Sequence, residues 1–272
     1  MHTLSELNDV LPQRRQSQRM PMLFVGHGSP MVTLSEDGFA KAWRSIGRSL
    51  PVPVAVLCVS AHWMTRGQTH VLAVDQPETI HDFGGFPQAL FDIQYPAPGA
   101  PALAAETTSL LADFAAYESH DWGLDHGTWS VVRHLFPDAN IPVYQVSVDM
   151  EMSFERQQAL GETLSSLRER GVLIVGSGNV VHNLRMIRGD GPAYDWAETF
   201  DRWVASCIAR RDFAAIAHAP ERHSAFQLAH PTVDHYAPLN YVLGAVRQDD
   251  AMLSFNEAID LGSASMTSYL FA

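Results

Sequence analysis

Short apolar runs alternate with amphipathic stretches along most of the chain, and this alternation is the first guide to the fold. Residues 22–27 and 52–63 are nearly continuous apolar runs rich in Val, a pattern typical of strands that are covered on both faces. Residues 36–50, between them, place large apolar side chains at helical spacing, namely Phe39, Trp43, Ile46 and Leu50. The pattern therefore predicts a strand, helix, strand unit of the crossover type.

Further elements continue this alternation to the end of the chain. Strands are predicted over 69–75, 141–149 and 172–178, and a last one in the tail that contains SMTSYLFA. Helices are predicted over 101–116, 128–136, 153–171, 192–212 and 238–246. Neither a repeat nor a low-complexity linker divides these elements. The sequence therefore predicts one α/β domain, whose central sheet is largely parallel or mixed and is flanked by helices.

Domain limits and broad function class follow from composition. Residues 1–19 are polar and lack a sustained apolar face, so we expect a flexible leader before a single catalytic domain over 20–272. The chain has 18 Lys+Arg against 30 Asp+Glu, and this net charge of −12 opposes binding to nucleic acid. No apolar stretch reaches about 18 residues, so we expect no membrane partner. Cys58 and Cys207 are too few for a disulfide framework, which favours a cytoplasmic location.

Histidines gather where the predicted strands end. His27 and His62 follow two of the apolar runs, and His182 lies four residues after a third. Because the carboxyl ends of parallel strands meet at one edge of a sheet, we expect these imidazoles to face one crevice. His230 and His235 come from HPTVDHYAP, which precedes a predicted helix. Several convergent imidazoles indicate a mononuclear site for a first-row metal such as Zn, Fe, Cu or Ni.

Other chemistries find less support. The sequence has no H-E-x-x-H, no pair of Cys ligands and no P-loop. Ser29 in GHGSP and Ser177 in GSGN lack the G-x-S-x-G environment of a nucleophilic serine, and GSGN lacks the further glycines of a nucleotide loop. His126 in GLDHGTW is either polarised by the adjacent Asp125 or part of a local turn, and both interpretations remain open here.

Seven motifs in order along the chain resemble those of class III extradiol ring-cleavage dioxygenases of the LigB superfamily, in the branch of 4,5-DOPA extradiol dioxygenases. The motifs are GHGSP (26–30), SAHW (60–63), DFGGFP (82–87), YPAPG (95–99), LDHGTW (124–129), GSGNVVHN (176–183) and HPTVDHYAPL (230–239). Each motif alone is weak, but their common order makes the resemblance specific. It covers roughly residues 20–272.

The resemblance implies an enzyme that uses non-haem Fe(II) and O2 to open a catechol ring beside its two hydroxyls. Its metal ligands carry over to His27, His62 and one histidine of HPTVDH, which we take as His235. Asp234 is the alternative if the third ligand is a carboxylate oxygen. The expected product is of the muconic semialdehyde type, and the expected partners are a small catechol, such as DOPA, and O2.

Three further histidines are assigned catalytic roles by the same resemblance. His182 matches the acid–base residue that takes a proton from the catechol and later returns it. His126 is expected to hydrogen-bond the substrate or oxygen, and His230 to line the pocket. Candidate walls for the aromatic ring are Phe83, Phe86 and Trp129.

Two alternative functions use the same fold. A zinc-dependent hydrolase or amidase would use the histidines to make a metal-bound hydroxide, and a non-catalytic interaction protein would retain only the fold. With zinc, His182 could serve as a fourth ligand and give a closed tetrahedral site that is inactive as a dioxygenase. The motifs contain no basic cluster, which disfavours a strongly anionic substrate. Oligomeric state is not indicated by the sequence.

Overall fold

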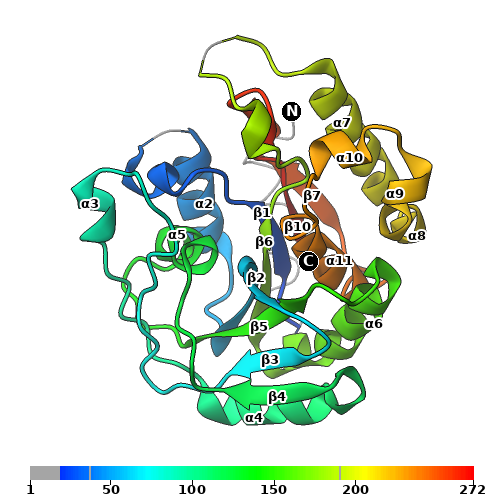
Figure 1. Ribbon diagram of the computed structural model, residues 1–272. Helices are drawn as coiled ribbons and strands as arrows, with labels where there is room; N and C mark the ends of the chain where they lie inside the picture. Colours follow the sequence, from blue (N-terminus) through cyan, green and yellow to red (C-terminus); the bar gives the residue numbers. More distant parts are fainter. Residues whose placement is uncertain (1–18, 37, 190) are drawn as a thin grey trace.

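A single mixed sheet of eight strands forms the centre of the protein, with helices on both faces (Figure 1). The computed structural model describes residues 19–36, 38–189 and 191–272, so the predicted leader lies outside the described residues except for Arg19. The strands of this sheet are β1 (Met22–Gly26), β2 (Ala55–Thr65), β3 (Thr69–Leu72), β4 (Ala116–Ser119), β5 (Val143–Asp149), β6 (Val172–Gly178), β7 (Met252–Phe255) and β10 (Ser268–Phe271). A separate pair consists of β8 (Ile259–Asp260) and β9 (Ala264–Ser265).

The sheet has a parallel centre and antiparallel borders. Its strand order is β4-β3-β5-β2-β6-β1-β10-β7. Strands β5, β2, β6 and β1 run parallel, whereas β3 is antiparallel to β5 and β10 is antiparallel to β1. The expectation of a largely parallel or mixed sheet is confirmed. Because β1, β2 and β6 point the same way, their carboxyl ends meet at one edge, where the candidate histidines lie.

Helices cover the two faces of the sheet in separate layers. The α-helices are α2 (Gly38–Ser49), α3 (Gln88–Phe91), α4 (Pro101–Leu110), α5 (His126–Leu135), α6 (Phe154–Leu164), α7 (Asp195–Ala209), α8 (Phe213–Ala217), α9 (Ala219–Arg222), α10 (Phe226–Ala229) and α11 (Ala237–Gly244). The 3-10 helices are η1 (Pro30–Leu34), η2 (Ala112–Phe114), η3 (Ser165–Arg170) and η4 (Leu184–Met186).

In the described part of the chain, no helix combines the length and the apolar character needed to span a membrane.

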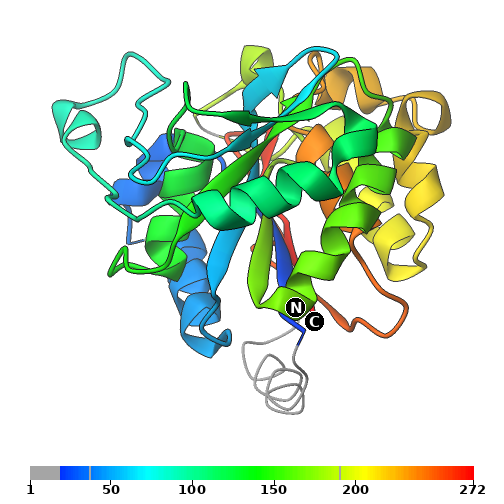
Figure 2. The ribbon, with the colours of Figure 1, turned by 90° about the horizontal axis from the view of Figure 1, so that it is seen from below.

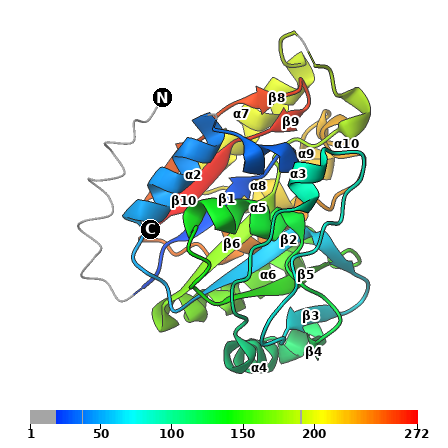
Figure 3. The same ribbon diagram turned by 90° about the vertical axis from the view of Figure 1, so that its left-hand side faces the viewer.

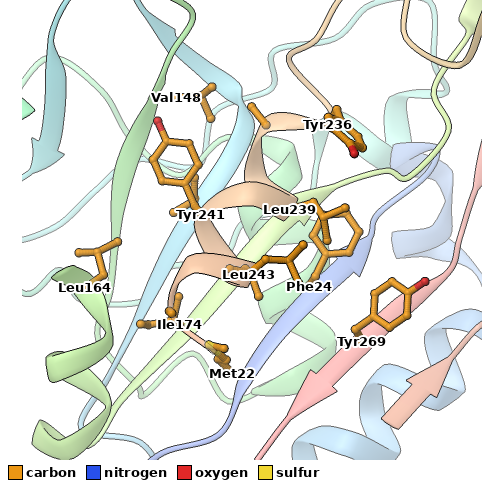
Figure 4. Close-up of a cluster of buried hydrophobic side chains, with 14 of the residues drawn as sticks. Met22, Phe24, Val148, Leu164, Ile174, Tyr236, Leu239, Tyr241, Leu243 and Tyr269 are labelled. Atoms are coloured by element: carbon orange, nitrogen blue, oxygen red, sulfur yellow. The ribbon is translucent and has the colours of Figure 1, made fainter. Parts of the chain in front are cut away.

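Alternating side chains on the strands pack against these two layers. On β1, Met22 and Phe24 face the core beneath α4, α6, α7 and α11, whereas Leu23 and Val25 face the core beneath α2 and α5. Figure 3 shows α2 and α5 on the side facing the viewer, and Figure 4 shows Leu239 and Leu243 of α11 beside Phe24. Since both faces are buried, the central strands are apolar at nearly every position, as the sequence pattern indicates.

Two predicted helices are shorter than expected because the backbone changes conformation. The helix expected over 101–116 ends at Leu110, and Ala115 adopts a left-handed conformation (φ 49°) before β4 begins. Helix α4 then lies against β3 and β4 at the edge of the sheet (Figure 2). The helix expected over 153–171 tightens into η3, and Gly171 (φ 79°) ends it as predicted. The Ser153 side chain caps α6 by accepting a hydrogen bond from the Arg156 amide.

A buried ion pair lies near the amino ends of β1 and β6. The Arg168 guanidinium binds both carboxylate oxygens of Asp250 at 2.6 and 2.8 Å, and both side chains are fully buried. Arg168 also donates to the carbonyls of Met20 and Ala245, at 2.8 and 3.1 Å. Burial by itself would raise the pKa of Asp250, but the hydrogen bonds and charge of Arg168 outweigh it and lower that pKa.

Candidate metal centre and active site

Five histidines meet at the carboxyl ends of the parallel strands. His27 directly follows β1, His62 lies near the end of β2, and His235 precedes α11. Ring centroids of these three imidazoles are 5.0–5.2 Å apart. His126 lies 3.9 Å from the ring of His62, and His182 stacks on His235 with 3.4 Å between centroids. The structure therefore brings together five of the histidines that the sequence singles out.

Close backbone packing holds the loops that carry His27 and His235. The amide of His27 donates to the Gly178 carbonyl at 3.1 Å, and the Asn179 amide donates to the His235 carbonyl at 2.9 Å. A Cβ on Gly178 would lie 2.3 Å from that His235 carbonyl oxygen, so only glycine permits this approach. Gly28 has φ +61°, a left-handed turn that a side chain would strain. The glycines in GHGSP and GSGN thus position both imidazoles.

Hydrogen bonds determine which nitrogen of His27 carries the proton. The Ser177 hydroxyl donates to the Gly127 carbonyl at 2.5 Å, so its oxygen accepts from Nδ1–H of His27 at 3.0 Å. Burial, followed by the neighbouring imidazoles, lowers the pKa of His27 well below its ordinary value, so the ring is neutral at pH 7. A neutral imidazole protonated at Nδ1 presents a lone pair at Nε2. His27 therefore directs an unprotonated nitrogen toward His62.

A carboxylate lies beside Nδ1 of each of the other two imidazoles. Nδ1 of His62 lies 3.2 Å from Asp82 Oδ2, and Nδ1 of His235 forms a short hydrogen bond with Asp234. Burial lowers the pKa of His62 to about 4 and that of His235 well below its ordinary value. His235 thus donates from Nδ1, and the carboxylate beside Nδ1 of His62 favours a proton on that nitrogen, which leaves Nε2 of both rings without one. This is the usual support for a metal-binding histidine.

The three imidazoles fit one metal ion. Nε2 of His27 and Nε2 of His62 are 3.2 Å apart, and the oxygens beside the two Nδ1 atoms favour a proton on Nδ1 of each ring. Two nitrogens bound to one metal at about 2.1 Å stand roughly 3.0–3.4 Å apart, depending on the angle between them. Ligand atoms of His27, His62 and His235 all lie within 4.8 Å of one another. A cation among these nitrogens would replace the repulsion of their lone pairs by coordination.

Two other groups of side chains have metal-ligand spacing, but their carboxylates are already engaged. One group is His62, Asp82 and His126, and the other is His182, Asp234 and His235. Asp82 accepts a hydrogen bond from Nδ1 of His126 and lies 3.2 Å from Nδ1 of His62, and Asp234 accepts from His235. The carboxylates therefore support the ligands from behind, and the set of His27, His62 and His235 offers the free nitrogens.

His126 and His182 extend the cluster into a cavity of about 430 Å³. Asp82 accepts hydrogen bonds from both the amide and Nδ1 of His126, each at 2.9 Å. Asp125 instead caps α5 by accepting from the Thr128 amide, so it is part of a local turn rather than the partner of His126. Burial lowers the pKa of His182 to about 4. Both imidazoles line the cavity beside the predicted ligands.

Apolar side chains form most of the remaining cavity wall. Phe83 and Phe86 line it, as the sequence predicts, and their rings meet edge to face at 5.4 Å. Further apolar lining comes from Pro30, Leu184, Ile187, Leu261 and Ala264. The wall offers an aromatic substrate both flat apolar contact and access to the histidines.

The structure places two of the candidate residues behind this wall. Trp129 is fully buried, donates to the Ile80 carbonyl at 2.8 Å, and packs against Phe83 with centroids 6.2 Å apart. His230 is fully buried as well, and its Nε2 donates to the Val180 carbonyl at 2.8 Å. Neither is among the residues that line the cavity, which differs from the expectation for both.

Asp82 and Ser177 belong to the site although the sequence analysis gave them no role in it. Asp82 opens the DFGGFP motif, and its two oxygens join His62 to His126. Ser177 was considered only as a nucleophile, whereas its hydroxyl orients His27. The motifs DFGGFP and GSGN drew attention to the segments that contain these two residues. Only the folded structure shows which imidazole each side chain contacts.

Comparisons with known proteins agree with this geometry. A model of the catalytic LigB subunit of aromatic ring-opening dioxygenases matches residues 22–269. The chain is 44% identical to 4,5-DOPA dioxygenase extradiol of Escherichia coli (strain K12), covering 93% of this chain and 94% of that protein. It is 34% identical to the protein of the same name from Beta vulgaris, covering 91% and 95%.

A solved structure has the same fold. The crystal structure of an uncharacterized protein from Escherichia coli K12 matches with a TM-score of 0.82 and 37% identity, covering 93% of this chain and 100% of that one. The match therefore covers most of this chain and the whole of the other. The chain belongs to the LigB family of aromatic ring-opening dioxygenases and is an extradiol ring-cleavage enzyme.

Proposed function

We propose that this enzyme cleaves the ring of a catechol of the DOPA type, with Fe(II) held by His27, His62 and His235. The observation that carries the metal assignment is the convergence of these three rings, each with an oxygen beside Nδ1 and with ligand atoms within 4.8 Å of one another. Names of the relatives support a DOPA-like substrate. Fe(II), when bound, supplies the redox chemistry that lets O2 react with an aromatic ring.

His182 is proposed as the residue that moves the catechol proton. It lines the cavity and stacks on the predicted ligand His235, so its imidazole lies beside the place where the diol must bind. An imidazole within hydrogen-bond reach of a hydroxyl can accept its proton and return it to a later species. His182 is also the residue that could become a fourth ligand when zinc occupies the site.

His126 and Phe83 are proposed to orient the bound ring. Because Nδ1 of His126 donates to Asp82, its Nε2 remains for a hydrogen bond with substrate or oxygen. Phe83 meets the ring of His126 edge to face at 5.4 Å, and Phe86 extends the same wall. Trp129 supports Phe83 from behind. His230 is proposed as a positioning residue, since it holds the Val180 carbonyl two residues before His182.

The product is proposed to be of the muconic semialdehyde type, with both oxygen atoms retained. The test is O2 uptake by protein reconstituted anaerobically with Fe(II) and then given L-DOPA or a simple catechol. We expect one O2 consumed for each catechol, a yellow product, and a mass gain of two oxygen atoms. Apoprotein and zinc-loaded protein are the controls and should consume none.

Either of two results would contradict the proposal. Iron-loaded protein that consumes no O2 with any catechol would contradict ring cleavage at this site. Zinc-loaded protein that hydrolyses an amide or ester, while the iron form remains inert toward catechols, would favour the hydrolase alternative. The variant His120→Gln is a matched histidine control, because its exposed side chain lies outside the cavity and its loss should leave the O2 uptake unchanged.

A further inference from the structure

We propose that this site disfavours catechols whose ring substituent carries a net negative charge, and that Leu184 and Ile187 at the cavity mouth set this preference. The inference rests on the proposed function, because it specifies the substrate class of the same site. It concerns the part of the substrate that does not react.

Burial along the cavity wall indicates which way a substrate must lie. His27, His126 and His235 are at most 5% exposed, whereas Leu184 and Ile187 line the same cavity and are 60% and 44% exposed. The histidines therefore form the inner end and the two aliphatic side chains form the mouth. A catechol that presents its diol to the histidines directs a substituent on the far side of its ring toward Leu184 and Ile187.

The cavity wall offers a charged substituent little compensation. Among the described residues that line it, Asp82 is the only Asp or Glu, and there is no Lys or Arg. Asp82 already accepts hydrogen bonds from His126 and lies 3.2 Å from Nδ1 of His62. A carboxylate held between Leu184 and Ile187 would lose hydration without gaining a cationic partner, which is costly. An alkyl substituent would instead bury apolar surface against both side chains.

Two arginines of the same segment, Arg185 and Arg188, do not change this conclusion. Arg188 stacks over the ring of Tyr194, with its guanidinium carbon 4.0 Å from the ring centroid, and donates to the Pro192 carbonyl. Arg185 is exposed and is not among the lining residues. Both cations lie in the same short segment as Leu184 and Ile187, yet the aliphatic side chains are the ones that face the cavity.

The test compares three catechols that differ in the charge of their ring substituent. Values of kcat/KM are measured for iron-loaded enzyme with 4-methylcatechol (neutral), L-DOPA (zwitterionic) and 3,4-dihydroxyphenylacetate (anionic). Affinities of the same three compounds are measured in parallel on zinc-loaded protein. We expect 4-methylcatechol to exceed 3,4-dihydroxyphenylacetate at least tenfold in both quantities, with L-DOPA between them, and the difference in turnover to arise mainly in KM.

Charge at the mouth should alter this ranking. In Leu184→Arg, the ratio of kcat/KM for the anionic catechol to kcat/KM for the neutral one is expected to rise about tenfold. Leu184→Gln introduces a side chain of similar size without charge. It should lower kcat/KM for both substrates by the same factor and leave their ratio unchanged. Arg185→Gln should change neither the ratio nor the activity, since that side chain lies outside the cavity wall.

Three outcomes would overturn the inference. The first is equal kcat/KM and equal affinity for the anionic and neutral catechols in the unmodified enzyme. The second is the same ratio in Leu184→Arg and Leu184→Gln, which removes Leu184 from the determinants. The third is selective loss of the anionic substrate in Arg185→Gln, which assigns the mouth a cation. Failure of ring cleavage itself appears separately, as absent turnover with every catechol, and the affinities on zinc-loaded protein still decide the ranking.

Discussion

Two buried polar clusters lie at opposite ends of the same parallel strands, and they differ in how completely they are hydrogen-bonded. Near the amino ends of β1 and β6, Arg168 makes four hydrogen bonds to Asp250 and to two carbonyls. Near the carboxyl ends, Nδ1 of His27 is hydrogen-bonded and Nδ1 of His62 faces Asp82, whereas the two Nε2 atoms face each other at 3.2 Å. One cluster is complete within the protein, and the other is not.

The difference separates a structural role from a chemical one. Buried polar atoms are usually satisfied, so a set that converges without partners indicates a missing ligand. Arg168 and Asp250 join the segment before β1 to the segment before β6, and their loss should affect folding. The histidines contribute lone pairs that only a cation can use. Variants in the two clusters should therefore change different measurements.

The largest effect is expected for His27→Ala and His62→Ala. Each removes one of three predicted protein ligands, so metal affinity should fall by more than about 100-fold and ring cleavage should disappear. Metal content by mass spectrometry of metals and chelator competition provide the readouts, and circular dichroism verifies the fold. Full metal stoichiometry in both variants would exclude these residues as ligands.

His182→Ala should separate proton transfer from metal binding. Loss of a positioned acid–base group lowers turnover by about 10²–10⁴-fold, whereas the three proposed ligands remain. Metal content should therefore match that of the unmodified enzyme while kcat falls. Unchanged kcat across the pH range would contradict the role assigned to His182.

Asp82→Asn should have an intermediate effect on the metal cluster. An amide keeps one acceptor but turns an N–H₂ group toward one of the two imidazoles that Asp82 now joins. Supporting hydrogen bonds of this kind typically change metal affinity or activity by about 10–100-fold. The exposed Asp75→Asn provides the matched control, and equal metal affinity in both variants would show that Asp82 has no such role.

Arg168→Met should affect stability and not chemistry. Breaking a buried pair by removing one partner costs about 3–5 kcal/mol of unfolding free energy, measured by urea titration. Arg19 also contacts Asp250 at 3.1 Å, which offsets part of the loss. Metal content per folded molecule should stay constant. A fall in metal content at full folding would show that the two clusters are coupled.

The same pair predicts how stability depends on pH. Because the pKa of Asp250 is lowered in the folded state, its contribution is present above the unfolded pKa of about 3.9 and is lost as pH falls through the folded value. Arg168→Met removes the partner but not the burial, so this acid-dependent loss should shrink. Urea titrations between about pH 3 and pH 7 measure the difference between the two proteins.

Cys58→Ser should have the smallest effect. Cys58 is fully buried on β2, and burial raises the pKa of its thiol, so it remains a neutral packing group. Placing a hydroxyl there costs about 1–2 kcal/mol of stability and should leave ring cleavage unchanged. Loss of activity in a well-folded variant would assign the thiol a role in the site.

Strand positions and their histidines could be predicted because they depend on local pattern. Apolar runs identified β1, β2, β5 and β6, and their shared direction brought His27, His62 and His182 together. The order of the seven motifs along the chain indicated the family. By contrast, β4 and β7 are four-residue edge strands whose pairing depends on partners far along the chain.

Side-chain direction in loops was the part that the sequence could not predict. His230 and His235 share one motif. The ring of His230 hydrogen-bonds to the Val180 carbonyl, whereas the ring of His235 lies beside His27 and His62. Trp129 and Phe83 are both aromatic, but the helix that carries Trp129 turns it inward behind Phe83. No periodicity applies to Asp82, because its segment has no regular structure.

Strand β10 links the formation of this site to the order in which the chain is synthesised. Met22 of β1 pairs with Phe271 of β10, so the strand that leads into His27 lacks one neighbour until the chain has been synthesised as far as residue 271. Contacts across such a separation must overcome a large loop entropy and form late. A ribosome-bound chain ending before residue 268 therefore leaves one edge of β1 open, and chaperones that shield unpaired strands should act on this protein until synthesis has passed β10.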